Sequence, residues 1–300
     1  MADTATTTGM SRRELRRANP DRLPFGKLLA WAGAGLSAGA NFIVLGYLTL
    51  YATDTLKMSP ATIGSIIAVG VVVNAVMGFV AGWLVDRTPE NKWGKARPYE
   101  LAVPLLWLLT GILFAAPASS PGSSTVAWIV VVVLLIRGIA MPLLTANDTL
   151  YMARSFPNRI VYAKVQTRAG ILTALGAIAV SVTLPIFLNR AGKSPEAWTA
   201  VIAVYCVVLG ILGLSRGVFV KEVFRAESGE EPVRIRDMVA VLKTNRWMFV
   251  LFAMYLCAQA MLGANVASYY FRYVVGNLAL QATLAPLGIA LLPVCSRCRG

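Results

Sequence analysis

Long apolar stretches alternate with short polar bridges along the whole chain. Each stretch holds about 20 residues, the length that an α-helix needs to cross about 30 Å of hydrocarbon. Eight such stretches occur, at approximately 28–52, 61–85, 99–117, 125–150, 167–189, 197–220, 247–271 and 278–294. Cores of soluble proteins do not repeat this pattern so many times, so the sequence predicts an all-α polytopic membrane protein.

Composition and charge agree with this class. The chain is 57% hydrophobic and 14% charged, whereas soluble domains are about 45–50% apolar and about 25% charged. The net charge of +14 would also suit a nucleic-acid-binding protein. The basic residues, however, collect in alternate bridges, and only Lys57, Arg190, Lys193 and Arg272 fall on the other side. This asymmetry follows the positive-inside rule. It predicts a multi-pass protein of the plasma (inner) membrane with a cytoplasmic N-terminus, and it argues against a nucleic-acid partner.

The residue types present argue against an enzyme. The chain contains no histidine, which excludes histidine triads and histidine metal sites. Cys295 and Cys298 form a single C-x-x-C pair, whereas a zinc ribbon needs two. No bridge carries clustered carboxylates or a phosphate-cradling glycine loop. We therefore expect no catalytic residue, no metal and no cofactor.

The bridges divide the chain into four parts. Residues 1–24 form a basic cytoplasmic leader, 25–220 the first six helices, 221–246 a long cytoplasmic linker, and 247–300 the start of a second bundle. This order is typical of transporters built from two six-helix repeats. Twelve helices at this spacing would need roughly 450 residues, so about eight of an expected twelve are present. We therefore expect the sequence to be a piece of a longer protein.

The bridge "DRTPENKWGKARP", residues 86–98, is unusually charged for its position between two apolar stretches. Thr88-Pro89 and Gly94 favour a turn, and Pro98 suits the first turn of the next helix. Gly82 allows close helix approach, and the basic side chains can bind carboxylates or lipid phosphates. We predict a cytoplasmic latch that gates a transporter, formed by Gly82, Asp86, Arg87, Thr88, Gly94, Lys95, Arg97 and Pro98.

The stretch "GWLVDRTPENKWGKARPYE" closely resembles the helix 2–3 signature of the glycoside–pentoside–hexuronide:cation symporters, the melibiose-permease branch of the major facilitator superfamily. "YLTLYATDTLKMSPATIG" and "ASYYFRYVVGN" agree with it. The resemblance runs from about Phe25 to Gly276. It implies a major-facilitator-type bundle of twelve helices that takes up a sugar or glycoside with sodium or protons.

The resemblance also points to the coupling ion. It places Asn74 and Gly78 where the melibiose-permease branch carries two cation-binding aspartates one helical turn apart. The family's acidic positions in helices 4 and 1 align near Ala140 and near Ser37 or Ala38. Because none of these residues is charged, we expect protons in place of sodium, with Asp148 as the nearest available carboxylate.

Polar residues inside the apolar stretches are candidates for substrate binding, because such residues are usually functional or paired. Arg168 matches the family's sugar-contacting arginine. Arg137 could face the substrate or a proton donor, or could pair with Asp148. Asn41, Asn74, Gln259 and Asn265 could line a sugar cavity or join helices by hydrogen bonds. Trp107 and Trp128 could stack on a sugar ring or lie at the membrane interface, and Asp54 and Glu100, at membrane edges, are expected to be structural.

The leading hypothesis is therefore a secondary transporter of sugars or glycosides that works by alternating access, with a small-molecule substrate and membrane lipid as partners. Two alternatives remain open. The same fold could move an amphipathic lipid or drug, or the chain could be a degenerate membrane fragment that does not transport.

Overall fold

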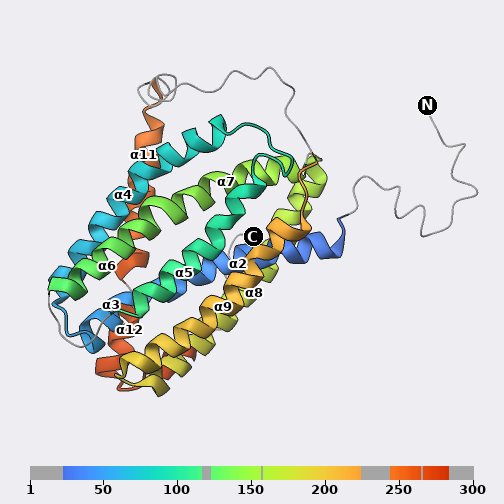
Figure 1. Cartoon of the computed structure of the whole chain (residues 1–300). Helices are drawn as coiled ribbons and strands as arrows, with labels where there is room; N and C mark the ends of the chain where they lie inside the picture. Colours follow the sequence, from blue (N-terminus) through green and yellow to red (C-terminus); the bar gives the residue numbers. More distant parts are fainter. Residues whose placement is uncertain (1–22, 117–122, 157, 224–243, 265, 284–300) are drawn as a thin grey trace, which may run out of the picture.

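The computed structural model describes residues 23–116, 123–156, 158–223, 244–264 and 266–283, and most of this part is helical (Figure 1). Some helical runs change type along their length. The first joins α2 (Phe25–Gly46), α3 (Leu48–Leu50) and the π-helix η1 (Tyr51–Thr55), and the fourth joins α6 (Ser123–Leu135), the π-helix η3 (Ile136–Ala140) and α7 (Met141–Ser155). The other runs up to residue 223 are α4 (Pro60–Arg87), the 3₁₀-helix η2 (Arg97–Leu101) with α5 (Ala102–Phe114), α8 (Arg159–Ala191) and α9 (Pro195–Phe219).

A shorter set of helices follows the linker. It comprises α11 (Trp247–Ala264), α12 (Val266–Tyr269), the π-helix η4 (Tyr270–Val274) and the 3₁₀-helix η5 (Leu278–Thr283). The seventh predicted stretch is thus helical wherever it is described. Of the eighth, only residues 278–283 lie within the described part.

Within the described residues, six runs are long and apolar enough to cross a membrane: 25–55, 60–87, 97–114, 123–155, 159–191 and 195–219. They coincide with the first six predicted stretches, which confirms a multi-pass, all-α membrane protein. The fifth starts earlier than the predicted residue 167, because the basic sequence "RIVYAKVQTR" continues the helix. Most of the predicted leader and linker lies outside the described residues, so the division into two bundles stays a prediction.

Three of these helices begin at residues whose side chains suit a helix start. Ser59 accepts a hydrogen bond from the Thr62 N–H at 3.1 Å, and Ser194 accepts one from the Ala197 N–H at 3.3 Å. Both serines precede a proline, which has no N–H to leave unsatisfied in the first turn. Asn158 accepts from the Ile160 N–H at 2.8 Å. Such N-caps satisfy donors that would otherwise lack a partner, so the local sequence fixes where α4, α8 and α9 start.

The helices pack closely at small residues. At Gly213 in α9, a Cβ atom would overlap Ser37 Oγ of α2 and Val103 Cγ1 of α5. Glycine therefore lets α9 approach both neighbours at once. Beside this crossing, the Trp107 indole N–H donates to Ser37 Oγ at 2.7 Å. Trp107 is buried here, which makes it a packing residue of the bundle.

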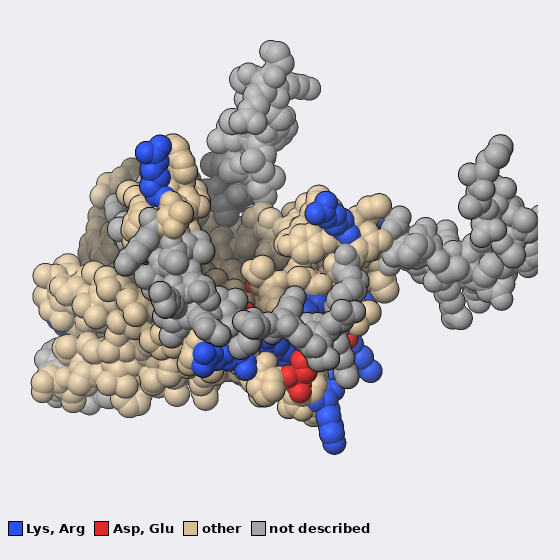
Figure 2. Space-filling model, turned by 90° about the horizontal axis from the view of Figure 1, so that it is seen from above, with Lys and Arg blue, Asp and Glu red and all other residues tan. Residues whose placement is uncertain are grey.

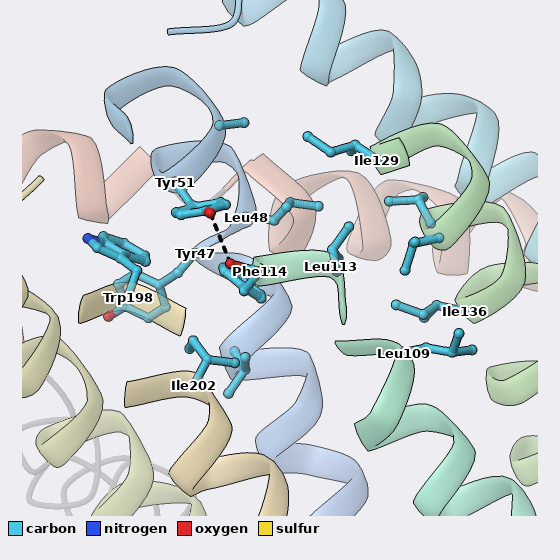
Figure 3. Close-up of a cluster of buried hydrophobic side chains, with 14 of the residues drawn as sticks. Tyr47, Leu48, Tyr51, Leu109, Leu113, Phe114, Ile129, Ile136, Trp198 and Ile202 are labelled. Atoms are coloured by element: carbon cyan, nitrogen blue, oxygen red, sulfur yellow. Dashed lines mark hydrogen bonds between the residues drawn. The ribbon is translucent and has the colours of Figure 1, made fainter. Parts of the chain in front are cut away.

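Aromatic side chains close the core at one end of the bundle. Tyr51, Phe114 and Trp198 come from η1, α5 and α9, and all three are buried (Figure 3). The ring centroid of Tyr51 lies 5.2 Å from that of Phe114 and 5.4 Å from that of Trp198. The Tyr51 O–H donates to the Phe114 carbonyl at 2.9 Å. Tilted aromatic pairs at these distances stabilise a core beyond their buried area, so this cluster ties three helix ends together.

The charged bridges gather at one end of the molecule. We call it the basic end and define it by the 86–98 bridge, the last turn of α7 and residues 220–223. Seen from above, Lys and Arg atoms lie there beside a few Asp and Glu atoms (Figure 2). The distal end lies at the other tips of the helices and holds η1, Phe114 and Gly192. The Tyr51–Phe114–Trp198 cluster belongs to the distal end.

Candidate functional site

The carboxylate of Glu222, just after α9, is enclosed by the 86–98 bridge. Its Oε1 accepts from the backbone N–H groups of Ala96 and Arg97, both at 2.8 Å, and its Oε2 accepts from the Lys95 N–H at 3.1 Å. The first N–H groups of a helix have no partner inside the helix and form a natural anion site. Glu222 therefore fills the site at the start of η2.

Gly94 makes room for this arrangement. Its φ of +100° lies in the left-handed region, which favours glycine. A Cβ atom at Gly94 would in addition overlap the Glu222 carboxylate. The turn predicted from the glycine is thus present, and its second purpose is to admit an acidic side chain from a distant part of the chain.

Further bonds tie the bridge to α7 and α9. Arg154, at the end of α7, pairs with Glu90 at 2.6 Å and with Glu222 at 3.3 Å. Arg97 donates to the carbonyls of Gly217 and Val218 at the end of α9. Glu90 belongs to the bridge itself, and the other partners lie at the end of α9 or just after it, so these bonds hold the bridge against α7 and α9.

The remaining residues of the predicted latch take varied positions. The Lys95 ammonium donates to the backbone carbonyl of Asp86 at 2.7 Å, and the Arg87 guanidinium lies over the Trp83 ring, 4.6 Å from its centroid. The Thr88 hydroxyl hydrogen-bonds to the Tyr99 hydroxyl, and Pro98 lies in the first turn of η2. A Cβ atom at Gly82 would meet nothing within 4 Å. The side chains of Asp86 and Arg87 are exposed. The predicted gating role of these residues stays a prediction.

A second charged cluster lies deeper at the basic end. Arg216 of α9 makes two bonds to Glu100, Nε to Oε2 at 3.0 Å and Nη2 to Oε1 at 2.8 Å. Asn147 also donates to Glu100 Oε1, at 2.9 Å. Both charged residues are buried, and the guanidinium stacks over the Trp31 ring at 4.6 Å. These buried bonds fit the expectation, made from its position at a membrane edge, that Glu100 is structural.

Asp148, the expected coupling carboxylate, belongs to the same cluster. It pairs with Arg216 Nη1, and 57% of its side chain is exposed. Arg137 lies eleven positions before Asp148 on one helical run, about 16 Å along the axis. The alternative in which Arg137 pairs with Asp148 therefore does not fit the structure.

Arg137 lies instead beside α4. It belongs to the π-helix η3, and its Cγ would lie 3.3 Å from a Cβ placed on Gly70. Asn74 follows Gly70 by one turn on the same face of α4, and its side-chain Oδ1 is buried without a hydrogen-bond partner among the described residues. Short π segments in helices often mark functional sites. Two of the predicted substrate residues thus come from facing helices.

The structure describes the side chains of two other predicted substrate residues, Asn41 and Arg168, and places them elsewhere in the bundle. Asn41 is buried, and its Nδ2 donates to the Thr110 hydroxyl at 2.8 Å, which fits the interpretation as a bond between α2 and α5. Arg168 is exposed on α8. Gln259 lies on α11 and nothing is described of its side chain, while Asn265 falls outside the described residues. Trp128 donates to the Ile112 carbonyl at 3.0 Å.

A contact at the distal end was not foreseen. Asp54 of η1 is only 3% exposed. Its Oδ2 lies 3.3 Å from Arg272 Nε, and its Oδ1 accepts from the Tyr273 hydroxyl. Both partners lie within "ASYYFRYVVGN", which served above only to recognise a family. The presence of a lone arginine in that stretch and of a lone aspartate in "YLTLYATDTLKMSP" was the signal available in the sequence.

Comparison with known proteins agrees with this architecture. Residues 32–295 match the family described as MFS/sugar transport protein. The chain belongs to this family. The predicted resemblance to major facilitator sugar symporters and the predicted fold class are thereby confirmed.

Two relatives of this major facilitator protein are informative. The isoprimeverose transporter of Lactiplantibacillus pentosus is 24% identical over 284 residues, which cover 91% of this chain and 58% of the relative. The uncharacterized symporter YnaJ of Bacillus subtilis (strain 168) is 25% identical over 245 residues, covering 76% of this chain and 50% of the relative. The chain thus spans between half and three-fifths of the length of these curated relatives.

Proposed function

We propose that this chain forms part of a secondary transporter, not an enzyme, which moves a sugar or glycoside across the plasma membrane by alternating access. The family match over residues 32–295 carries the proposal. The relative that is named for its substrate, a transporter of isoprimeverose, supports a glycoside. Arg137, Arg168 and Asn74 are the proposed substrate contacts, because charged and amide groups recognise sugar hydroxyls and are costly inside a membrane without a purpose.

The proposed coupling ion is the proton. A sodium site needs several oxygen ligands, usually with a carboxylate among them, whereas Asn74 and Gly78 bring no charge to the face of α4 where the family's aspartates align. Asp148 is the proposed proton acceptor, because its side chain is more than half exposed while it contacts the buried Arg216. Protonation of Asp148 would loosen that contact.

The basic end is proposed to face the cytoplasm. Lys95, Arg97 and Arg154 lie there, and positive residues favour the cytoplasmic side of a membrane. Arg87 and the exposed Trp93 of the same bridge would meet lipid headgroups. The N-terminus would then be cytoplasmic as well, because α2 begins at this end. A reporter that works only in the cytoplasm should be active when it is fused after Phe219. A reporter that works only outside the cytoplasm should be active when it is inserted after Lys57.

Uptake into proteoliposomes tests the proposal. The full-length protein that carries this sequence is reconstituted, and radiolabelled isoprimeverose and related glycosides are supplied with an inward proton gradient or an inward sodium gradient. We expect accumulation that follows the proton gradient and disappears with a protonophore. Sodium-driven uptake would refute proton coupling, and the absence of uptake of any glycoside would favour a different substrate or a chain that does not transport.

Variants on one helix test the substrate site. Arg168→Ala should raise KM for the glycoside about tenfold or more, the loss expected when a charged hydrogen bond to the substrate is removed. Arg190→Ala changes the same residue type on α8 at the distal end and should leave KM unchanged. Equal KM values for Arg168→Ala and Arg190→Ala would remove Arg168 from the site.

A variant on α7 tests the coupling. Asp148→Asn should abolish accumulation against a gradient while exchange of internal for external glycoside continues.

A further inference from the structure

Four polar contacts join residues 269–273 to the first six helical runs at the distal end. Besides the two bonds of Asp54, the hydroxyls of Thr53 and Tyr269 lie 3.0 Å apart, and Arg272 Nη2 donates to the Gly192 carbonyl at 3.3 Å. Tyr269 and Tyr273 stack with their ring centroids 6.2 Å apart. Residues more than two hundred positions apart therefore form one compact polar cluster.

The two helix ends that meet here are built alike. η1 and η4 are both π-helices of five residues. In each, the backbone N–H of the next residue donates a hydrogen bond to the first carbonyl of the π-helix. The Leu56 N–H donates to the Tyr51 carbonyl at 3.2 Å, and the Val275 N–H donates to the Tyr270 carbonyl at 3.1 Å. A residue of positive φ comes next in both cases, Lys57 at 57° and Gly276 at 77°. The backbone thus repeats the same sequence of conformations.

This repetition gives a register between the two segments. Asp54 is the fourth residue of η1, and Tyr273 is the fourth residue of η4. The two residues that hydrogen-bond to each other therefore occupy equivalent positions. Equivalent residues meet in this way where two copies of a structure are related by a two-fold axis, and the halves of many transporters are related by such an axis along the membrane normal.

The first half of the contact rests on a rigid base. Asp54 follows Tyr51, which is fixed in the aromatic cluster with Phe114 and Trp198 (Figure 3). The Gly192 carbonyl that receives Arg272 also accepts from the Trp198 indole N–H, at 3.1 Å. The acceptors that hold Arg272 thus have fixed positions before the second segment docks on them.

Among its described side chains, the second segment is buried against the first six runs at the distal end. Leu278 is buried in the main core, and Tyr269 and Phe271 pack against that core. At the start of α11, by contrast, every residue from Trp247 to Met254 is exposed. The four polar contacts between the two segments are therefore made at the distal end, by η4 and by Tyr269 just before it.

We propose that Asp54, Arg272 and Tyr273 form a latch that closes the distal end of the transporter and that must break before the substrate site opens toward that side. The inference rests on the proposed alternating access. In the predicted two-repeat architecture the bonds cross between the first and second repeat, so a rocking motion that separates the repeats at this end must part them. Asp54 is a positioning residue for this motion and does not touch the substrate.

Removing one side of a buried charge pair leaves the other charge without compensation, so the closed state should lose stability relative to the open one. The experiment measures the opening directly. The native cysteines Cys206, Cys257, Cys295 and Cys298 are replaced by serine, and Thr49→Cys is introduced one turn deeper than Thr53 on α3. A membrane-impermeant maleimide is then added from the distal side, and the labelling rate is measured without any substrate.

We expect slow labelling in the parent and rates about tenfold higher or more in Asp54→Asn and in Arg272→Gln. Glu196→Gln is the matched control, because it removes a carboxylate at the same end that bonds only to Ser194 among the described side chains. This variant should label at the parent rate. Labelling at the parent rate in both Asp54→Asn and Arg272→Gln, or an equal increase of the labelling rate in Glu196→Gln, would overturn the proposed latch at the distal end.

A cross-link provides a second test that does not weaken the fold. Thr53→Cys/Tyr269→Cys should be joined by a short bis-methanethiosulfonate reagent, because the native hydroxyls lie 3.0 Å apart and the reagent spans the length that the tyrosine side chain occupied. The cross-linked protein should lose glycoside uptake and regain it with reductant, and uptake at the parent rate while cross-linked would refute the latch. Because labelling needs no substrate, a labelling response without uptake of any glycoside would support the latch while refuting the proposed sugar transport.

Discussion

The buried pair of Arg216 and Glu100 makes the sharpest prediction about stability, because one arginine has two acidic partners in different surroundings. Glu100 is 2% exposed and makes two bonds to the guanidinium, while the Asp148 side chain is 57% exposed and makes one. Breaking a buried ion pair from one side costs about 3–5 kcal/mol. A pair with an exposed partner contributes about 0–1 kcal/mol.

Glu100→Gln should therefore lower the free energy of unfolding by about 3–5 kcal/mol, whereas Asp148→Asn should lower it by about 1 kcal/mol at most. The cost arises because the guanidinium stays buried over the Trp31 ring, 4.6 Å away, with its main counter-charge removed. The double variant Glu100→Gln/Arg216→Gln should cost less than the sum of its single changes, since neither charge is then left alone.

Unfolding in mixed detergent micelles measures these values, with the denaturing detergent varied and the free energy extrapolated to its absence. Tryptophan fluorescence, to which the seven tryptophans of the chain contribute, reports the loss of tertiary packing, and circular dichroism reports the loss of helix. Equal costs for Glu100→Gln and Asp148→Asn would refute the reasoning from burial. A cost below about 1 kcal/mol for Glu100→Gln would show that the pair is not desolvated.

Two further predictions concern packing and use the same unfolding measurement. Gly94→Ala should lower the free energy of unfolding by about 1–3 kcal/mol, because the new Cβ atom strains a positive φ and overlaps the Glu222 carboxylate. The control Gly78→Ala, where a Cβ atom meets nothing within 4 Å, should be neutral or slightly stabilising. A similar loss of stability in both variants would contradict this reasoning. Thr110→Val should cost about 1–3 kcal/mol by leaving the Asn41 amide without its acceptor, and KM for the glycoside should not change; a raised KM would place Asn41 in the substrate cavity.

The sequence predicted the membrane spans well because their signal is local. An apolar run of sufficient length is visible without any tertiary information, and Ser59-Pro60 and Ser194-Pro195 mark helix starts by their own chemistry. The start of α8 was misplaced for the same reason. Arg159 and Lys164 break the apolar run, yet the helix continues through them, since basic residues near the end of a membrane helix reach the interface without interrupting it.

The partners of the charged residues could not be predicted, because each bond joins positions far apart in the chain. Glu222 fills the anion site at the start of η2 from beyond α9, and nothing in the residues around it distinguishes it from the other acidic residues of the linker. Asp148 was named as the nearest available carboxylate for proton coupling, and that role stays a prediction. Its partner Arg216 lies in the last turn of another stretch, and the spacing along one helix suggested Arg137 in its place.

The location of these charged pairs bears on how such a transporter moves. At the basic end, Arg154 of α7 pairs with Glu90 of the 86–98 bridge and with Glu222 just after α9, and Arg216 of α9 pairs with Glu100 of η2 and with Asp148 of α7. All of these residues lie between positions 90 and 222. At the distal end, the pair of Asp54 and Arg272 joins the first run to the segment after the linker. A rocking motion between two rigid repeats leaves bonds inside a repeat intact and breaks those between repeats. Under the proposed alternating access, the charges of the 86–98 bridge would keep the first six runs together, and opening of the distal end would require the bonds around Asp54 to break.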